Sequence, residues 1–377
     1  MPGSLAAQAP PRTSPGGQPV REERFISVVI PNRNGAATIG RCLGAALASD
    51  YGRFEVVVAD DGSEDASVEI IQGFPCRLVR LASHGGVSRA RNAGARASAG
   101  ELLLFVDADC LLRRNTLSIA NASYGEDANR VLGGTYTPSP HDRDFFSAFQ
   151  SVFINHFETK KKDPDYLAAH AMVIDAELFR RSGGFLEDSF IGVAASVEDV
   201  EFSHRLRRAG CRLAIDPELQ VQHVFRFSLR RSLGNAVKKA RYWTMYSLAN
   251  RDLFADSGAA SLELKTNVLC GLLEACLAVA SLASGAAWPL AAIPLLLALD
   301  LAVNRRLAAA WLRARGRAFS ALAMLYYLTL YAAAVGIGAV AGAMQYLWSI
   351  RLLGRYRPCT PRSGTRGLSF PRGDPST

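Results

Sequence analysis

The chain has 377 residues, of which 49% are apolar and 20% are charged, and its mean hydropathy is +0.08. So apolar a chain buries enough surface to fold, which excludes disorder for most of its length, while 43 Lys and Arg and 34 Asp and Glu exclude a pure membrane bundle. The net charge of +9 suits an anionic partner: a nucleic acid, an acidic membrane surface or a phosphorylated substrate.

The first 24 residues are rich in Pro, Gly, Ala and Ser and lack the apolar stretch of a signal peptide. We therefore expect residues 1–24 to form a disordered tail. The seven cysteines are odd in number, are scattered and form no CxxC pair. This pattern predicts free thiols in a reducing compartment.

Short β-rich runs alternate with helical patterns between residues 25 and 110. Strands are expected at 25–30 (ended by Pro31), 54–59, 76–81 and 101–106. Helices are expected between them at 38–48, 67–72 and 87–99. Strands that alternate with helices indicate an α/β fold with a mainly parallel sheet.

The rhythm loosens after Asp109, although the segment up to residue 225 still reads as one domain. The pattern predicts helices at 111–122 and 198–209 and strands at 131–137 and 213–221. No helix or strand is predicted for the polar, aromatic segment 141–165.

A basic linker follows at residues 226–261. Its first part interleaves Arg and Lys with apolar residues at helical spacing, as in a helix that lies on an anionic membrane. There are two alternatives: the basic residues form a solvated face of the helix, or they bind a phosphate group of a substrate. No nucleic-acid-binding motif accompanies the charge, so a nucleic-acid partner is not expected.

The composition turns apolar over residues 262–350, and a basic tail is expected at 351–377. Apolar stretches at 266–284, 286–303 and 318–350 are each about as long as a membrane-spanning helix, or longer. This predicts about three transmembrane helices; a buried hairpin of a soluble protein is the alternative.

The basic loop between the second and third of these stretches contains five Arg and no acid, which predicts that it is cytoplasmic. Three spans would then leave the basic tail on the opposite side. Two spans, four spans or one re-entrant segment would remove this conflict, and the sequence leaves the count open.

Paired acids follow two of the expected parallel strands. Asp60-Asp61 comes after the second strand and Asp107-Ala108-Asp109 after the fourth, and open α/β sheets bind ligands at this edge. On an extended chain, Asp107 and Asp109 would point to the same side. Carboxylates there suit Mg²⁺ or Mn²⁺ shared with substrate phosphates, although a DxD pair alone is a weak signal.

Five segments in order give the chain a specific resemblance. They read VVIPNRNG, VVVADDGSEDAS, GVSRARNAGARASAGELLLFVDAD, RRSGGFLEDSF and SVEDVEFSHRLRRAG. Over residues 25–225 the chain resembles the family-two glycosyltransferases of the GT-A fold. The resemblance implies an inverting transferase that uses a nucleotide-diphosphate sugar, with UDP as the expected nucleotide.

The same resemblance implies roles for individual residues. Arg33 stands where the family usually has Tyr, and its guanidinium would stack on the base instead. Asp109 and His223 would hold Mg²⁺ or Mn²⁺. The nucleotide-sugar-binding set would comprise Pro31, Asn32, Arg33, Asp60, Arg91, Asp107 and Ala108.

Asp199 is the expected catalytic base, since a carboxylate near an acceptor hydroxyl takes its proton as the new bond forms. Its alternative role is to complement the positive end of a helix dipole. Acceptor-side residues would be His170, Gly184 and Glu198. His170 departs from the small or amide residue of many members, which affects acceptor choice. The QxxRW signature of processive synthases is absent, so transfer of one sugar per binding event is expected.

These observations predict a metal-dependent glycosyltransferase on the cytoplasmic face of the cell membrane, with a lipid-linked hydroxyl or glycan acceptor. A polyprenyl-phosphate glycosyl synthase is an alternative, but an ionised phosphate acceptor needs no base, and Glu198-Asp199 is intact. A non-catalytic membrane scaffold or lipid transporter is another, which would have lost Asp109 or Asp199. A sugar-nucleotide pyrophosphorylase would need a Gly-rich loop that NRNGAAT does not supply.

Overall fold

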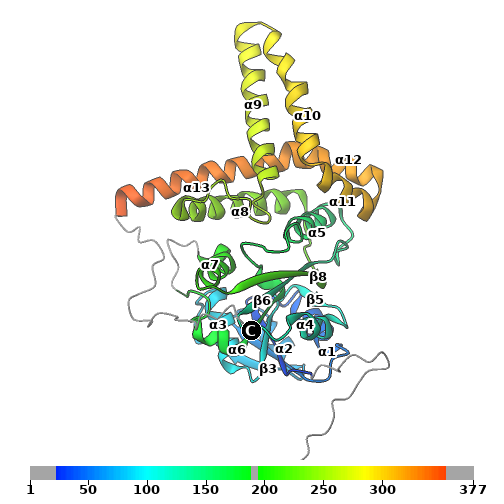
Figure 1. The fold of residues 1–377 in the computed structure, drawn as a ribbon, viewed down its shortest axis with the longest axis vertical. Coiled ribbons are helices and arrows are strands. Elements are labelled where there is room, and N and C mark those ends of the chain that lie inside the picture. The colour runs from blue at the N-terminus through cyan, green and yellow to red at the C-terminus, as the bar shows by residue number, and fades with distance from the viewer. Residues whose placement is uncertain (1–22, 188–193, 354–377) are drawn as a thin grey trace, which may run out of the picture.

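The computed structural model describes residues 23–187 and 194–353, and the expected tails lie outside this part of the chain except at their inner ends. An α/β domain forms one end of the molecule, a layer of long helices covers it, and a helical hairpin projects from that layer (Figure 1). The α/β expectation is confirmed.

One mixed sheet organises the α/β domain. Its strands run in the order β3-β2-β1-β4-β7-β6-β8-β5. The first four in chain order are mutually parallel, whereas β7 is antiparallel to β4 and β6. The bounds are β1 Ile26–Asn32, β2 Phe54–Asp60, β3 Arg77–Arg80, β4 Leu102–Phe105, β5 Cys110–Leu112, β6 Arg130–Tyr136, β7 Met172–Asp175 and β8 Arg212–His223.

Strand β1 does not end at Pro31, contrary to the sequence prediction. It continues to Asn32, and Pro31 pairs in register with Ala59 of β2. In a parallel sheet, successive residues direct their N–H and C=O groups to alternate neighbours. Asn32 accepts from Asp61 on the β2 side, so Pro31 faces the β4 side, where the ladder has ended at Val29. The missing N–H of proline therefore breaks no ladder bond.

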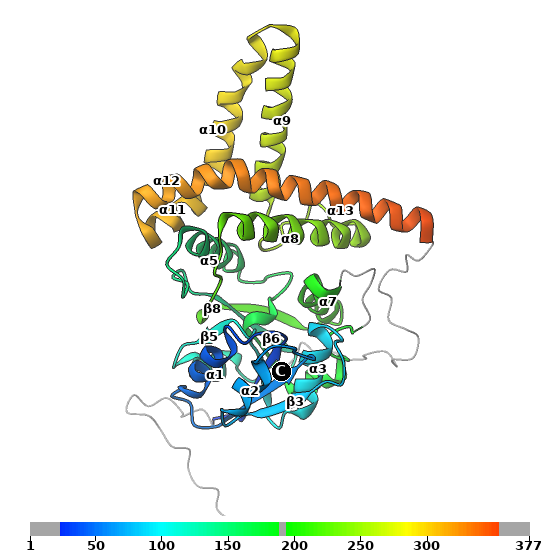
Figure 2. The same cartoon turned by 180° about the vertical axis from the view of Figure 1, so that it is seen from behind.

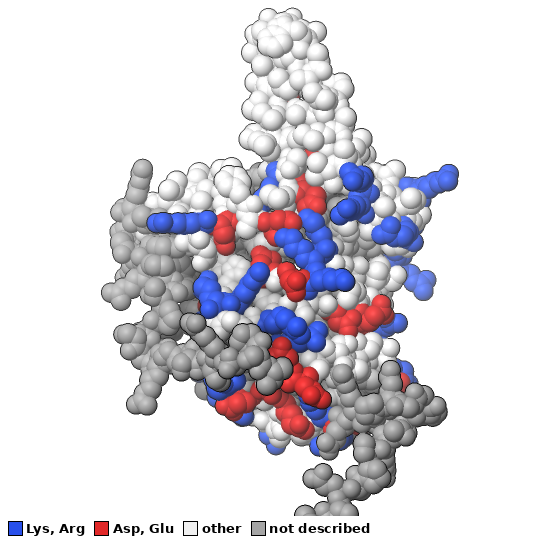
Figure 3. Space-filling model, in the orientation of Figure 1, with Lys and Arg blue, Asp and Glu red and all other residues white. Residues whose placement is uncertain are grey.

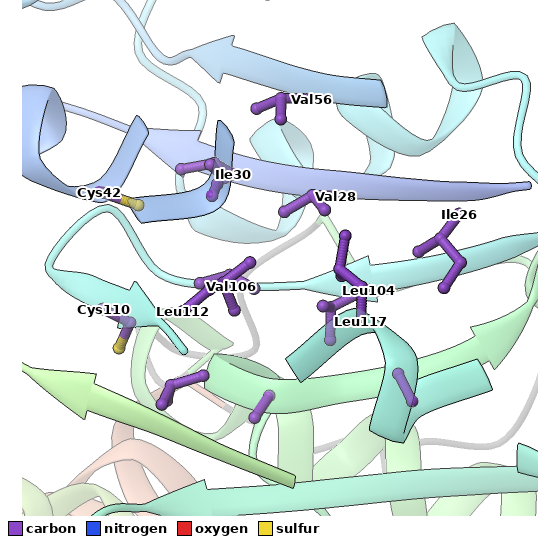
Figure 4. Packing of buried hydrophobic residues seen from close by; sticks show 14 of the residues in the cluster. Ile26, Val28, Ile30, Cys42, Val56, Leu104, Val106, Cys110, Leu112 and Leu117 are labelled. Carbon is purple, nitrogen blue, oxygen red and sulfur yellow. The ribbon is translucent and has the colours of Figure 1, made fainter. Parts of the chain in front are cut away.

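Helices cover both faces of this sheet, and the alternation of β1 supplies a core to each. Ile26, Val28 and Ile30 pack on one face, with side chains of the helices and of β5 (Figure 4). Val29 contributes to the opposite core, with Phe105. The helices of this domain are α1 Ile39–Leu47, α2 Ser67–Gln72, α3 Val87–Ala97, α4 Thr116–Tyr124, α5 Phe145–Glu158, η1 Ala169–Ala171, α6 Ala176–Arg181 and α7 Ala194–Arg208.

Two sequence predictions in this domain are corrected. The helix expected at 111–122 is divided, because residues 110–112 form β5 against β8 and the helix α4 begins only at Thr116. The segment 141–165, which received no element, contains the helix α5. Asp144 caps it by accepting a hydrogen bond from the Ser147 N–H, a local signal visible in the sequence.

The C-terminal helices form a layer and a hairpin. Helices α9 and α10 project away from the α/β domain, while α12 and α13 run across their base, with α13 alongside α8 (Figures 1 and 2). Within the described residues, two helical segments are long and apolar enough to cross a membrane: residues 262–284 and 317–349. The bounds are α8 Leu229–Asn250, α9 Leu262–Ser284, η3 Trp288–Ala292, α10 Ile293–Val303, α11 Arg305–Arg315, α12 Arg317–Tyr326, η4 Tyr327–Tyr331 (a π-helix) and α13 Ala332–Leu353.

An aromatic core joins this layer to the α/β domain. The ring of Phe149 in α5 stacks on Trp311 of α11 with centroids 5.1 Å apart, and both side chains are fully buried. Lys160, just after α5, forms ion pairs with Asp256 at 3.0 Å and with Glu263 of α9 at 2.7 Å. The base of the hairpin is therefore tied directly to the α/β domain.

Candidate active site

The acidic motifs lie where the parallel strands β1, β2 and β4 end. Asp60 is the last residue of β2, and Asp107 to Asp109 follow β4. Adjacent parallel strands bring their carboxyl ends to one edge of a sheet, so both motifs reach the same side of the domain.

Asp107 and Asp109 do not lie on an extended chain, which corrects the reason given for their common direction. They belong to a turn in which the Cys110 N–H donates to the Asp107 carbonyl at 2.9 Å. The turn gives the two carboxylates different partners: Asp107 faces Arg91, and Asp109 faces His223.

Strand pairing brings Asp109 and His223 together across 114 positions of sequence (223 − 109). Cys110 in β5 is the register partner of His223 at the end of β8. Asp109 Oδ1 lies 3.4 Å from His223 Nε2, and the Cys110 Sγ lies within 4.8 Å of both donor atoms. Two neighbouring ligands at about 2.1 Å in octahedral geometry are about 3 Å apart, so Asp109 and His223 fit one ion.

The electrostatics of this pair also suit a cation. Burial and then the charge of Asp107 raise the pKa of Asp109 to about 7, because two carboxylates share the turn. Burial lowers the pKa of His223 to about 3, so the imidazole is neutral, as a metal ligand must be. The thiol of Cys110 is buried with a raised pKa, and a protonated thiol is a poor ligand for a hard ion.

Arg91 in α3 connects the turn that contains Asp107 with Glu198 in α7. Its guanidinium donates to Asp107 Oδ1 and to Glu198 Oε1, each at 2.7 Å, and it is 3% exposed. Although burial opposes ionisation, the charge of Arg91 lowers the pKa of Asp107. The Arg91 guanidinium also lies 5.4 Å from the ring centroid of Phe185, which follows the paired glycines. Arg91, which was predicted to bind the nucleotide sugar, therefore also holds Asp107, Glu198 and Phe185 in place.

Asp199 lies beside Glu198, immediately after a kink in α7. Val197 has non-helical angles (φ −144°, ψ 22°), so Glu198 and Asp199 open a new helical segment, as the sequence predicted. Asp199 Oδ2 accepts a weak hydrogen bond from the Ala169 N–H at 3.4 Å. Burial and then the charge of Glu198 raise the pKa of Asp199 to about 6. A carboxyl with this pKa takes up a proton more readily than a solvated one and is still ionised at neutral pH.

The nucleotide end of the site is held by internal hydrogen bonds. Asp60 is buried and accepts from Asn32 Nδ2 at 2.9 Å and from the Ser63 hydroxyl at 2.6 Å. Asp61 binds the loop before α3 by accepting from the N–H groups of Gly85 and Gly86. In the same region, Pro31 is buried and Arg33 exposed.

His170 lies in a buried polar cluster of its own. Its ring stacks on Tyr136 with centroids 4.0 Å apart, and its Nε2 lies 3.4 Å from Glu158 Oε2. Thr135 also donates to Glu158, at 2.8 Å. Although burial opposes the charge, Glu158 raises the pKa of His170, which favours the protonated imidazole beside this carboxylate.

Gly184 has a backbone role. Its φ is +67°, and an added Cβ would lie 2.5 Å from Asn92 Oδ1. Asn92 in turn exchanges hydrogen bonds with the backbone N–H and C=O of Phe185. Glycine is therefore required for this loop to pack on α3. Residues 188–190, the end of the matching motif, lie outside the described residues.

The structure thus joins most of the predicted residues through direct contacts. Asp109 meets His223, Arg91 meets Asp107 and Glu198, and Asn32 meets Asp60. Ala108 lies in the turn between the two acids. Sequence reasoning missed Glu158, Tyr136 and Cys110, of which only Cys110 had a signal, its position next to Asp109.

Part of the chain is similar to known glycosyltransferases. The family model "Glycosyl transferase family 2" matches residues 27–183. "Glycosyltransferase GlyG" of Streptococcus pneumoniae is 31% identical over 128 residues, which cover 32% of this chain and 42% of that protein. "Glycosyltransferase AglE" of Haloferax volcanii is 38% identical over 117 residues, which cover 29% of this chain and 38% of that protein. The chain thus spans less than half the length of these two curated relatives.

A solved structure extends the similarity of fold beyond that segment. The mannosyltransferase PcManGT from Pyrobaculum calidifontis, in complex with GDP-Man and Mn²⁺, aligns over 91% of this chain and 91% of its own. The TM-score is 0.52 at 20% sequence identity, a level that bears on the fold alone. The expectation of a GT-A fold is confirmed.

Proposed function

The chain belongs to glycosyltransferase family 2 through residues 27–183, and we propose that it transfers one sugar from a nucleotide-diphosphate sugar to a lipid-linked hydroxyl acceptor. The observation that carries this proposal is the chain of contacts at one sheet edge. Asp109 lies beside His223, while Arg91 joins Asp107 to Glu198, the neighbour of Asp199.

Donor binding begins at the ends of β1 and β2. Asn32 and Asp60 would present a fixed hydrogen-bonding edge to the base, since each already orients the other. Uracil offers a ring N–H to Asp60, which favours UDP. The exposed Arg33 would cover the base, because a guanidinium stacks on a planar ring. Asp107 would reach the ribose.

Mg²⁺ or Mn²⁺ would be held by Asp109 and His223. Because His223 offers nitrogen, the pair suits Mn²⁺ better than Mg²⁺, which prefers an all-oxygen shell. Held there, such an ion would supply Lewis-acid chemistry, offsetting the negative charge of the nucleoside diphosphate leaving group.

Asp199 would act as the base. The acceptor oxygen forms a bond to the anomeric carbon, its proton passes to the Asp199 carboxylate, and the nucleoside diphosphate leaves with the electron pair of the broken bond. A single in-line displacement inverts the anomeric centre, so an α-linked donor gives a β-linked product. Glu198, held by Arg91, positions the helix start that carries Asp199.

The acceptor is proposed to be lipid-linked because the site is fixed to an apolar hairpin. Helix α9 has 23 residues, about 34 Å in length, which exceeds the hydrocarbon core of about 30 Å. On the face shown in Figure 3, most of the hairpin carries no charge and Lys and Arg gather near its base. With α9 and α10 inserted, the basic α11 and the α/β domain would lie on one side, and the positive-inside rule supports the proposal that this is the cytoplasmic face of the cell membrane.

The test is release of nucleoside diphosphate by the purified full chain. UDP-, GDP- and dTDP-sugars are supplied with Mn²⁺ or Mg²⁺, with and without EDTA and a lipid extract. We expect release from one donor that needs the metal and rises with lipid. No release from any donor, with the protein still folded by circular dichroism, would overturn the proposal. Turnover on polyprenyl phosphate alone would identify a polyprenyl-phosphate synthase instead.

A further inference from the structure

The longest apolar segment of the chain lies across the base of the hairpin that α9 and α10 form. Residues 317–349 pass the length and hydropathy test for a membrane span. Yet α12 and α13 run across the base of α9 and α10 in both views, with α13 alongside α8 (Figures 1 and 2). If the hairpin enters a membrane, this segment is oriented along the membrane surface.

Close backbone contact holds α13 against α8. A Cβ added at Gly338 would lie 2.4 Å from the Val237 carbonyl oxygen, and one at Gly342 would lie 2.3 Å from that of Arg241. Two glycines four residues apart let helix backbones approach this closely. Arg241 also donates from Nε to Gln345 Oε1 at 2.7 Å. Turning α13 to cross a bilayer would break all of these contacts.

The other end of the segment is fixed as well. Tyr326, at the end of α12, donates its hydroxyl to Ser232 Oγ of α8 at 2.9 Å, and both residues are buried. Tyr327 is fully buried and packs 5.8 Å from Trp311, ring centroid to centroid. The inner side of the segment is therefore in contact with protein along its length.

The outer side is apolar and exposed. Large apolar side chains recur there at intervals of three or four residues, or multiples of these, and no Asp, Glu, Lys or Arg occurs between residues 318 and 350. Val340 is 59% exposed and Met344 61%. The stripe includes Leu322, Leu325, Ile337, Val340, Met344 and Leu347. So long a charge-free stripe is far more apolar than the surface of a typical soluble monomer.

Basic residues accompany this stripe on the neighbouring helices. Arg305, Arg306 and Arg313 of α11 are exposed, as are Arg231 and Lys238 of α8. An apolar stripe with flanking Lys and Arg matches the boundary between acyl chains and anionic headgroups.

We propose that the segment 317–353 lies flat in the interface of an anionic bilayer, with its apolar stripe on the acyl chains, and that only α9 and α10 enter the hydrocarbon core. This rests on the proposed membrane location. Three spans would have placed the basic loop and the basic tail on opposite sides of the membrane. A flat segment removes this conflict, because the end of α13 stays on the same side as the α/β domain.

Depth-dependent fluorescence quenching tests the proposal. A fluorescent amino acid is introduced at Leu325, Ile337 or Leu347 of the full chain, in separate proteins, by codon suppression. Each is reconstituted in vesicles of phosphatidylcholine and phosphatidylglycerol that contain lipids with a nitroxide near the headgroup or deep in the acyl chain. A flat segment predicts stronger quenching by the shallow nitroxide at all three positions. Strong deep quenching at Ile337 alone would show a span and overturn the proposal.

The same fluorophore at Leu272, near the middle of α9 and 60% exposed, separates this proposal from its premise. Deep quenching at Leu272 shows that the hairpin is inserted. Absence of quenching at Leu272 and in the segment would refute the membrane location itself. Quenching at Leu272 with none in the segment would mean that protein, such as a second copy, covers the stripe, and would overturn the interfacial assignment alone. Donor-dependent nucleotide release verifies the fold of each labelled protein.

Discussion

Arg91 and Glu198, 107 residues apart in the sequence, form a buried ion pair in which Nη1 donates to Oε1 at 2.7 Å. The second terminal nitrogen of the same guanidinium donates to Asp107. A planar fork with fixed donors suits this bridge, because it holds two carboxylates at once. The metal-side turn and the start of the helix that carries Asp199 are therefore fixed relative to each other by one side chain.

Removal of this bridge should destabilise the fold. Arg91→Ala leaves Asp107 and Glu198 close to each other without their cation, and breaking a buried pair costs about 3–5 kcal/mol. The free energy of unfolding, from denaturant titration in detergent, measures the effect. The matched control on the same helix is Arg96→Ala, because Arg96 is 64% exposed and its contact with Glu187 is 3.6 Å long. Equal unfolding free energies for the two variants would contradict the structural role of Arg91.

Metal binding should depend on two residues that are distant in the sequence, one in the turn before β5 and one at the end of β8. Asp109→Ala and His223→Ala should each weaken Mn²⁺ binding by more than the roughly 10–100-fold that loss of an outer-shell partner causes, since each removes a direct ligand. Electron paramagnetic resonance of free Mn²⁺, titrated without nucleotide, measures the affinity. His84→Ala is the control, because His84 contacts Asp61 on another loop. Unchanged affinity in His223→Ala would restrict the site to carboxylates.

The sequence was sufficient to predict the parallel half of the sheet and to select most residues of the candidate site. Asp60 and Asp107 to Asp109 were found because parallel strands carry their ligand residues at the carboxyl ends, a local and directional rule. Asp109 and His223 were paired by family resemblance. The physical cause of their contact, the register of Cys110 with His223, involves strands that the sequence did not show to be partners.

The features that sequence analysis did not predict depend on contacts between residues that are distant in the sequence. Glu158 was overlooked because α5 was not predicted, and its partners Thr135 and His170 come from other elements. The direction of α13 was equally hidden, since hydropathy records composition and not orientation. Gly338 and Gly342 acquire a meaning only when the α8 backbone lies against them.

The contact of α13 with α8 should be intolerant of larger side chains. Gly342→Leu inserts a side chain where a Cβ already lies 2.3 Å from the Arg241 carbonyl oxygen, and overpacking costs about 1–3 kcal/mol. Gly271→Leu in α9 is the matched control, because no atom lies within 4 Å of its added Cβ. Thermal unfolding of the two detergent-solubilised proteins gives the comparison. A melting temperature for Gly342→Leu no lower than that of the control would argue against the close approach.

The His170–Glu158 pair should make stability depend on pH. The folded state raises the pKa of His170 above its ordinary value, so its stabilisation is fully present below that ordinary value and is lost as pH rises through the folded-state pKa. The difference in unfolding free energy between wild type and His170→Asn should thus be larger at pH 6 than at pH 9. A difference that does not change with pH would mean that His170 acts through packing on Tyr136 alone.

Asp199 should control both the turnover and the decrease of kcat/KM at low pH (the acid limb of the pH profile). Asp199→Asn should lower turnover by at least about 10²-fold, the lower end of general-base effects, with donor binding close to normal. Because the pKa of Asp199 is raised to about 6, the active carboxylate is populated above that pH and is lost as pH falls through it. The kcat/KM of wild type should therefore fall tenfold per pH unit below about 6, with Mn²⁺ saturating so that Asp109 stays ionised. The residual rate of Asp199→Asn should lack this limb; a variant that keeps the limb would assign it to another group and remove Asp199 as the base.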